Sequence, residues 1–461
     1  MTVLSIAADP RTDVGASPLA DVGVSPLADV VGADLQAPLV TGGHARYVNL
    51  DYAASAPALR SVADRVSALL PLYSSVHRGA GYASAVSTAA YEAARAEIAR
   101  FVGARADDVV IVTRNTTDAL NLLATAAPGP VVHLDIEHHA NLLPWRARGG
   151  RIVSARSELA DIVAAVEDEL AREPAALLAV TGASNVTGEC LPLRRLAEVA
   201  HRHGARIAVD GAQLVPHRRV DVAATGIDYL AFSGHKLYAP FGAGVLVGRR
   251  DWLDVAPPYL AGGGAVRRVR LDATSWADCP ARHEAGTPNV VGAVALAAAC
   301  RAVAELPEQA VADHESALLA RLDEGLAGVD GVRPLRLWPE AERIGVVTFV
   351  VDDVPAELVA QYLSAEHGIG VRDGRFCAHP LLDRLHPAGA AVRASLGLGS
   401  RREDVDRLTA ALTALRRTGP RWSYASREGD YLPTPDPRPL PAWAAAEALP
   451  TAGPCHLSQA L

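Results

Sequence analysis

The stretch DYLAFSGHKLYAPFGAGVLVG runs from Asp228 to Gly248 and contains Lys236, the only lysine among the 461 residues of the chain. An apolar run precedes this lysine and a glycine-rich loop follows it. Arginine supplies every other strong side-chain cation. A lysine kept at this position therefore indicates a need for an amine, because an amine can lose its proton and a guanidinium cannot. Taken alone, a lysine just past a strand is a surface charge, and the segments around it decide between the two interpretations.

Composition and charge exclude several classes of function. Half of the residues are hydrophobic, which is enough for a sizeable core, and the formal net charge is -8. The arginines are scattered rather than gathered into a basic stripe, so we expect a small-molecule substrate and no nucleic acid. No apolar run approaches the roughly 18 residues of a membrane span, and no secretory signal opens the sequence. We therefore expect a cytoplasmic protein without membrane contact.

The cysteines form neither a disulfide framework nor a metal site by their spacing. Their number is odd and no CxxC motif occurs, which argues against both. A single reactive thiol is the alternative that this pattern leaves open. The five cysteines are Cys190, Cys279, Cys300, Cys377 and Cys455.

Between residues 66 and 301, short runs of β-branched residues alternate with longer alanine-rich stretches of helical spacing. This alternation predicts βαβ units and therefore an α/β domain with a mostly parallel central sheet. Helices are expected to start at Thr116 and Pro192. Strands are expected at 108–113, 130–136, 176–184, 206–210 and 228–233.

The remaining segments differ from this domain in composition and in their pattern of expected helices and strands. Residues 302–417 combine long helices with a few strands, which predicts a smaller α+β domain, and residues 45–65 are expected to join it. Residues 1–44 contain an imperfect octad repeat and are predicted to be a flexible leader. The proline-rich residues 418–461 are predicted to be a tail. The side chains expected to dock this tail are Trp422 and Trp443.

Polar residues stand where the predicted strands end. Asp210 closes one strand and Lys236 follows another. Thr116 and Thr117 open a helix directly after a strand, and the histidine pair 138–139 follows a third strand. Pyridoxal phosphate (PLP) chemistry needs an amine, a carboxylate for the pyridine nitrogen, an imidazole on the ring face and a phosphate cup at a helix N-terminus. Each feature alone also fits an ordinary strand end, N-cap or solvated loop.

Several motifs together resemble those of the class V aminotransferase superfamily, whose members are fold-type I PLP enzymes. They are SGHK, DGAQ, EHHAN, TRNTTDALNLLA, ASNVTG and HEAGTPN. The resemblance is closest to the cysteine desulfurases of the SUF type and extends from about Tyr47 to Leu415. It implies a PLP fold-type I large domain, a smaller C-terminal α+β domain, and PLP as the cofactor.

The resemblance implies a role for each matching residue around the cofactor. Lys236 would form the Schiff base, Asp210 would pair with the pyridine nitrogen, and Gln213 would bond the ring hydroxyl. His138 is preferred to His139 as the imidazole that stacks on the ring. The phosphate ligands would be Thr116, Thr117, Ser233, His235 and, from the neighbouring subunit of a homodimer, Thr287.

Other matching positions would face the substrate. Arg393 would grip the substrate carboxylate, and Asn185 would lie near the substrate amino group and the ring oxygen. Arg372, His77 and Arg78 would line the pocket, although His77 and Arg78 fit a solvated loop almost as well.

Cys377 lies in the segment VRDGRFCAHPLL, residues 371–382. A lone buried cysteine is usually a small hydrophobe. In the resembling desulfurases this segment carries the nucleophile, so Cys377 is predicted to be catalytic. Two departures concern the substrate side. Arg375 and Phe376 stand where a pair of histidines is common, and ASLGLGS follows Arg393 where a turn with tyrosine and asparagine is usual.

We therefore predict a PLP-dependent, cysteine desulfurase-like enzyme that converts L-cysteine to L-alanine and leaves a persulfide on Cys377. Its partners would be a small amino acid, a second copy of the chain and a sulfur-acceptor protein. A class V lyase, epimerase or aminotransferase without thiol catalysis is the first alternative. A non-catalytic protein of the same fold is the second.

Overall fold

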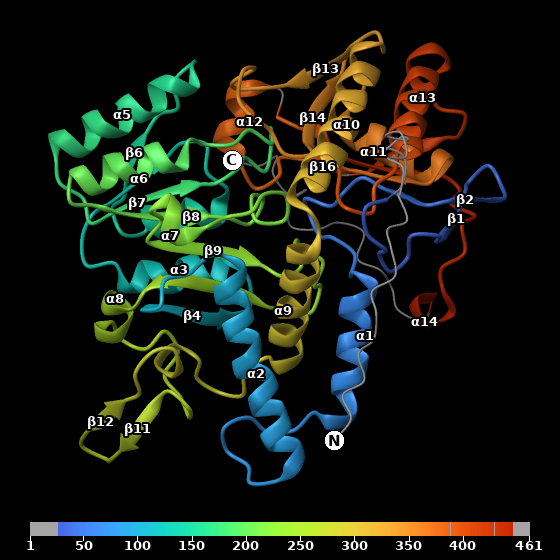
Figure 1. Cartoon of the computed structure of the whole chain (residues 1–461). Coiled ribbons are helices and arrows are strands. Elements are labelled where there is room, and N and C mark those ends of the chain that lie inside the picture. Colours follow the sequence, from blue (N-terminus) through green and yellow to red (C-terminus); the bar gives the residue numbers. More distant parts are fainter. Residues whose placement is uncertain (1–25, 388, 428, 446–461) are drawn as a thin grey trace, which may run out of the picture.

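The computed structural model describes residues 26–387, 389–427 and 429–445, which form a large α/β domain beside a smaller α+β domain (Figure 1). In the large sheet all neighbouring strands are parallel except β10, which is antiparallel to both of its neighbours. The mostly parallel sheet predicted from the sequence is thereby confirmed. The strand order is β4 (Asp108–Thr113), β10 (Gly244–Arg249), β9 (Tyr229–Ser233), β8 (Arg206–Asp210), β7 (Leu177–Thr181), β5 (Val131–Leu134) and β6 (Arg151–Val153).

Helices cover both faces of this sheet because its strands are apolar on both sides. In β9, Leu230 and Phe232 belong to one buried cluster and Tyr229 and Ala231 to another, as alternation along a strand requires. Helix α3 (Thr116–Ala126) packs into the second cluster, as does α8 (Arg250–Val255). The helices in the first cluster are α1 (Arg60–Leu69), α2 (Tyr82–Phe101), α5 (Leu159–Arg172), α6 (Leu193–Arg202) and α9 (Val290–Glu305). Two short helices, α4 (Leu143–Arg146) and α7 (Val222–Thr225), complete the domain.

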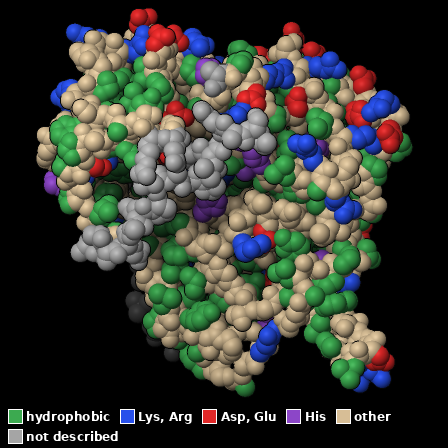
Figure 2. Space-filling model, turned by 180° about the vertical axis from the view of Figure 1, so that it is seen from behind, with side chains coloured by type: hydrophobic (Ala, Val, Ile, Leu, Met, Phe, Trp, Pro, Cys, Tyr) green, Lys and Arg blue, Asp and Glu red, His purple; other side chains and the backbone are tan. Residues whose placement is uncertain are grey.

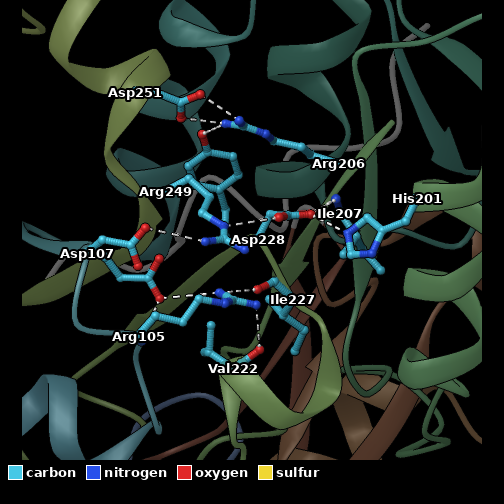
Figure 3. Close-up of polar contacts among 12 residues, drawn as sticks. Arg105, Asp107, His201, Arg206, Ile207, Val222, Ile227, Asp228, Arg249 and Asp251 are labelled. Atoms are coloured by element: carbon cyan, nitrogen blue, oxygen red, sulfur yellow. Dashed lines mark hydrogen bonds and ion pairs between the residues drawn. The ribbon is translucent and has the colours of Figure 1, made fainter. Parts of the chain in front are cut away.

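The carboxyl edge of the parallel strands, where they end, and the amino edge, where they begin, carry different polar residues. Strands β8 and β9 end at Asp210 and Ser233, so these side chains meet at the carboxyl edge. At the opposite edge, Asp228 precedes β9 and ties neighbouring elements together (Figure 3). Its carboxylate accepts a hydrogen bond from Ile207 N at 3.0 Å and lies 2.8 Å from His201 Nε2. Polar contacts thus link the elements at the amino edge, and the residues predicted to be functional lie at the carboxyl edge.

The smaller domain is built on a four-stranded antiparallel sheet. Its strand order is β13 (Val332–Leu335), β14 (Val346–Val351), β17 (Ala391–Ser395) and β16 (Arg372–Gly374). Its helices are α10 (Glu308–Ala327), α11 (Ala356–His367), α12 (His379–Leu385) and α13 (Arg402–Thr418). Strand β3 (Val48–Asn49) pairs in parallel with β15 (Ile369–Gly370), and Val48 and Leu50 are buried in the core of this domain. The smaller domain is thus built from segments that precede and follow the large domain in the sequence.

Two of the predicted domain boundaries fall inside helices. The boundary at 65/66 lies within α1 and the boundary at 301/302 within α9. Because α1 and α9 pack against each other, both helices belong to the large domain. The chain enters the smaller domain at Pro307, where α9 and α10 meet at 89°. No single helix in the described ranges is long and apolar enough to cross a membrane, although this bent pair reaches that length and hydropathy together.

The prediction of a flexible leader is wrong for its described part, residues 26–44. Leu27 N donates to Leu398 O at 2.7 Å, and Val40 N donates to Ala365 O at 3.0 Å. Strands β1 (Gln36–Pro38) and β2 (His44–Arg46) pair in antiparallel fashion. Isolated apolar residues such as Val30 and Val40, both buried, anchor a segment whose overall composition is that of a linker. Residues 1–25, which hold most of the octad repeat, lie outside the described part.

The proline-rich end docks on Glu366 through main-chain amides and the Tyr424 hydroxyl. Trp422 N donates to the buried Glu366 carboxylate at 3.1 Å, and the Tyr424 hydroxyl donates to it at the same distance. The Trp422 side chain donates to Pro435 O at 2.8 Å within the tail itself, so its predicted docking role stays a prediction. Trp443 is 78% exposed, so its predicted docking role is wrong. A hairpin of β18 (Tyr424–Arg427) and β19 (Asp430–Pro433) and the short helix α14 (Ala442–Ala445) follow the docking point. Residues 446–461 lie outside the described part.

The surface has one projecting element and mixed charge. The hairpin of β11 (Val266–Val269) and β12 (Thr274–Trp276) projects from the large domain, and Val269 and Leu271 are exposed on it (Figure 1). On the face seen in Figure 2, basic and acidic side chains are interspersed, in keeping with the scattered arginines of the sequence.

Candidate active site

A cavity of about 260 Å³ lies at the carboxyl edge of the large sheet, where the smaller domain covers it. The large domain contributes most of the residues predicted from the sequence: Lys236, Asp210, Gln213, His138, Thr116, Thr117, Asn185, Ser233 and His235. The smaller domain contributes Arg372, Phe376, Cys377 and Arg393. Thr116 and Cys377 line the same cavity although they are 261 positions apart in the chain.

Lys236 is half-buried and lines this cavity, so the interpretation as a surface charge is wrong. Burial lowers the pKa of its amine from the ordinary 10.5 to about 8, although the nearby Asp210 carboxylate acts in the opposite direction. The amine can therefore lose its proton close to neutral pH. Burial raises the pKa of Asp210, whose carboxylate accepts a hydrogen bond from Ala212 N at 3.0 Å. A buried carboxylate at this edge of the sheet suits a pyridinium nitrogen.

The N-terminus of α3 forms a cup for an anion. Thr116 N donates to Ser233 Oγ at 2.8 Å, and the hydroxyls of Thr116 and Ser233 lie 2.6 Å apart. The helix is capped by Asn115, whose Oδ1 accepts from Asp118 N at 2.9 Å. The positive end of the helix dipole thus faces the cavity, together with hydroxyl groups that can donate to a phosphate. Sequence reasoning overlooked Asn115, although its place before Thr116 is an N-cap signal.

A glycine in β10 allows this cup to form. A Cβ on Gly244 would lie 2.5 Å from Asn115 Cα, which is closer than side-chain contacts allow. The absence of a side chain therefore lets the strand approach the N-terminus of α3.

His138, and not His139, lines the cavity. Burial and the Lys236 charge lower the pKa of His138 to about 3, so its ring is neutral. Its Nδ1 accepts a hydrogen bond from Ala140 N at 3.0 Å, which puts the ring proton on Nε2. The neutral ring can stack on a flat cofactor. His139 instead lies against the smaller domain, where its ring contacts the His379 ring at 4.5 Å between centroids.

Arg393 is held rigidly in the wall of the cavity and is only 3% exposed. Its Nη1 donates to Asn185 O at 3.0 Å, and its Nη2 lies 3.3 Å from Asp51 Oδ1. Each terminal nitrogen of a guanidinium carries two hydrogens, so each retains one for a carboxylate. Asp51 was missed by the sequence analysis, although it lies in the matched stretch YVNLDYAASAP. Arg372, opposite Arg393 in the register of β16 and β17, adds a second cation.

Cys377 is the one thiol that lines the cavity among the four cysteines in the described ranges. It is half-buried, and its backbone φ of 52° lies in the left-handed region, as does that of Phe376. Burial raises the pKa values of the other described thiols, Cys190, Cys279 and Cys300, which makes them unreactive. Cys455 lies outside the described part.

Three predicted features do not belong to the cavity of this chain. His77 lies on an exposed loop, where its Nε2 is 2.9 Å from Glu92 Oε1, and the neighbouring Arg78 lies beside Gly264. Both residues lie outside the cavity of this chain, and their role in a pocket stays a prediction. Thr287 is exposed, and its role across a dimer interface stays a prediction. The turn 397–400 packs against the ring of Tyr52 and does not contact the cavity, so this departure is not on the substrate side.

Known proteins with the same features identify the family. Residues 48–408 match the family model described as aminotransferase class-V. A cysteine desulfurase of Dickeya dadantii is 39% identical over 386 residues, covering 80% of this chain and 92% of that protein. The solved structure of a cysteine desulfurase from Thermococcus onnurineus has a TM-score of 0.74 at 31% identity and covers 80% of this chain and 94% of its own. The Escherichia coli cysteine desulfurase CsdA has a TM-score of 0.71 at 33% identity and covers 79% and 94%. With its sheet, its cavity and this match over most of its length, the chain belongs to the aminotransferase class-V family.

Proposed function

We propose that this protein is a PLP-dependent cysteine desulfurase that converts L-cysteine to L-alanine and collects the sulfur as a persulfide on Cys377. One observation carries the proposal: the Lys236 amine, the Cys377 thiol and the Arg393 guanidinium line the same cavity. Desulfuration needs these three groups together, as a base, a sulfur acceptor and a carboxylate grip. The relatives at 31% to 39% identity that are named cysteine desulfurases support the same conclusion.

PLP fits the residues of this cavity. The buried Asp210 carboxylate suits a protonated pyridine nitrogen, and the cup of Thr116 and Thr117 at the N-terminus of α3 suits a phosphate. The neutral His138 ring would stack on the pyridine, and Gln213 would accept from the ring hydroxyl through its side-chain oxygen. When bound, PLP supplies an electron sink that makes the Cβ–S bond of cysteine labile.

The chain's own residues would carry the substrate and its proton. Arg393, with Arg372 beside it, would bind the cysteine carboxylate and so orient the Cα–H bond. Lys236 would take the Cα proton at Nζ, a step for which a pKa of about 8 is well matched to neutral pH.

Cys377 would take the sulfur. Lys236 and Arg393 lie close enough to this thiol for their charges to interact with it, and thiolates react best beside such cations. The Cys377 Sγ would attack the cysteine sulfur, so that an S–S bond forms as the Cβ–S bond breaks. The electron pair of the broken bond stays with the three-carbon fragment, which takes up a proton and leaves as alanine. The products are alanine and a Cys377 persulfide, so atoms and electrons balance without another oxidant.

The other parts of the proposal concern the setting of the enzyme. We propose a homodimer in which Thr287 of the second copy completes the phosphate cup, and a separate protein that accepts the persulfide sulfur. Placement among the SUF-type enzymes and in the cytoplasm also belongs to the proposal.

The test is to incubate the purified protein with L-cysteine, with and without a reductant, and to measure alanine and sulfide. We expect alanine in both cases and more sulfide with the reductant, because reduction releases the persulfide sulfur. Cys377→Ser should retain PLP but form alanine much more slowly, since a hydroxyl ionises far less than a thiol. Cys190→Ser is the matched control and should keep the wild-type rate, because Cys190 lies outside the cavity.

Mass spectrometry of the treated protein should find the added sulfur on the peptide that contains Cys377. Alanine formation by Cys377→Ser at the wild-type rate would contradict the proposal and favour a class V lyase, epimerase or aminotransferase. A colourless protein that does not take up added PLP would instead favour a non-catalytic member of the fold.

A further inference from the structure

The thiol of Cys377 sits on a strained segment, residues 374–378, which we name the thiol loop. Gly374 has a φ of 100°, and Phe376 and Cys377 both have a φ of 52°. The left-handed region is unfavourable for residues with a Cβ, so two consecutive residues in it persist only when neighbouring groups hold them there. The loop itself supplies one such contact, from Ala378 N to Arg375 O at 3.1 Å.

Two hydrogen bonds from the large domain hold the strained residues. Asn185 Nδ2 donates to Phe376 O at 2.7 Å, and His139 N donates to Cys377 O at 2.8 Å. Both donors come from the large domain, whereas the thiol loop belongs to the smaller one. Asn185 is the only one of the two donors that acts through its side chain, so it can be tested by substitution without changing the main chain.

Asn185 also contacts the carboxylate-binding arginine. Its main-chain oxygen accepts from Arg393 Nη1 at 3.0 Å, and the Arg393 guanidinium lies 5.2 Å from the centre of the Phe376 ring. Asn185, Phe376 and Arg393 are 6%, 5% and 3% exposed, so all three side chains are closely packed where they line the cavity. A substitution of the Asn185 side chain breaks the bond to the thiol loop and leaves the bond to Arg393 intact.

We propose that Asn185 is a positioning residue for the nucleophile: its side chain holds the thiol loop in the strained conformation that keeps Cys377 over the cavity. The family resemblance implies a different role, in which Asn185 serves the substrate amino group and the cofactor ring. The two roles predict different consequences of losing the amide. The anchoring of the loop does not depend on the reaction, whereas its effect on turnover rests on the proposed function.

The experiment measures the alkylation rate of Cys377 by iodoacetamide in the PLP-loaded protein, with the modified peptide quantified by mass spectrometry. Two variants are compared with the wild type. Asn185→Ala removes the amide, and Asn185→Asp keeps its volume but, as a carboxylate, cannot donate to Phe376 O. Asn121→Ala is the matched control, because its amide donates a hydrogen bond to Thr117 O within α3 and not to the thiol loop. The visible absorbance of bound PLP is recorded for each protein.

We expect both Asn185 variants to alkylate about fivefold faster, the factor that one lost hydrogen bond contributes to a local opening equilibrium. Their visible absorbance should match that of the wild type, and Asn121→Ala should alkylate at the wild-type rate. With cysteine as substrate, kcat should fall while KM changes less than twofold, since Arg393 keeps its bond to the main chain of residue 185.

Wild-type alkylation rates in both variants would overturn the proposal. A shifted visible band together with unchanged alkylation would do so as well and would assign Asn185 to the cofactor. If the wild type forms no alanine from cysteine, the proposed function fails, but faster alkylation of the variants still supports the anchoring role.

Discussion

Replacement of Lys236 by methionine should stabilise the PLP-free protein at neutral pH. The amine lies in the cavity, and burial lowers its pKa from 10.5 to about 8. At about 1.4 kcal/mol for each pH unit between the folded and unfolded pKa values, the protonated amine costs about 3 kcal/mol of folding free energy. Methionine has a similar length and carries no charge. Asp210, whose pKa burial already raises, can take up a proton once its cationic neighbour is gone.

The pH dependence has a definite sign. Between pH 8 and 10.5 the unfolded chain keeps the Lys236 proton and the folded protein has lost it, so the unfolded state binds more protons. The wild type therefore gains stability as pH rises through this window and loses it as pH falls. The advantage of Lys236→Met should be about 3 kcal/mol at pH 7 and should disappear near pH 10.5.

The assay is urea unfolding of the PLP-free proteins, followed by tryptophan fluorescence at one protein concentration across this pH range. The difference between variant and wild type removes the contributions of tyrosines and thiols that titrate in the same window. Arg194→Met on the exposed face of α6 is the control and should change stability by less than about 0.5 kcal/mol at every pH. Parallel pH profiles for Lys236→Met and the wild type between pH 8 and 10.5 would refute the reasoning.

Two further changes probe the cofactor site. Asp210→Ala should lower turnover by about a hundredfold and weaken PLP retention, because the pyridine nitrogen loses the group that keeps it protonated. The alanine assay measures turnover, and spectral titration with PLP measures retention. Wild-type turnover in this variant would show that Asp210 does not belong to the site. Gly244→Ala should push the N-terminus of α3 away, since the new Cβ would lie 2.5 Å from Asn115 Cα, and should weaken PLP binding about tenfold with little effect on the affinity for cysteine. Equal PLP affinity for Gly244→Ala and the wild type would show that the cup does not need this close approach.

The large domain could be predicted from local sequence because its signals are local. The run 206–210 was predicted as a strand and is β8, and the run 108–113 is β4. In a parallel sheet the residues that follow the strands meet at one edge, so Asp210, Ser233 and Lys236 could be grouped without coordinates. Lys236 is the only lysine of the chain, and this indicated that the site needs an amine.

Other parts of the site depend on contacts that no local pattern encodes. Asp51 and Arg393 are 342 residues apart in sequence, and their ion pair arises because β3 joins the smaller domain. The turn 397–400 seemed to face the substrate, but Tyr52 covers it. Likewise, residues 26–44 have the composition of a linker, yet hydrogen bonds to the smaller domain order them.

By itself the sequence determined the α/β architecture, the carboxyl edge of the sheet and the amine, carboxylate and anion cup that lie there, because strand periodicity and helix capping act over a few residues. Only the tertiary structure decided how the smaller domain completes the cavity, with Arg393 beside Asp51 and with Phe376 O and Cys377 O bonded by Asn185 and His139 of the large domain. Those positions result from the packing of two domains, and packing depends on side chains that are distant in sequence and meet only once the chain has folded.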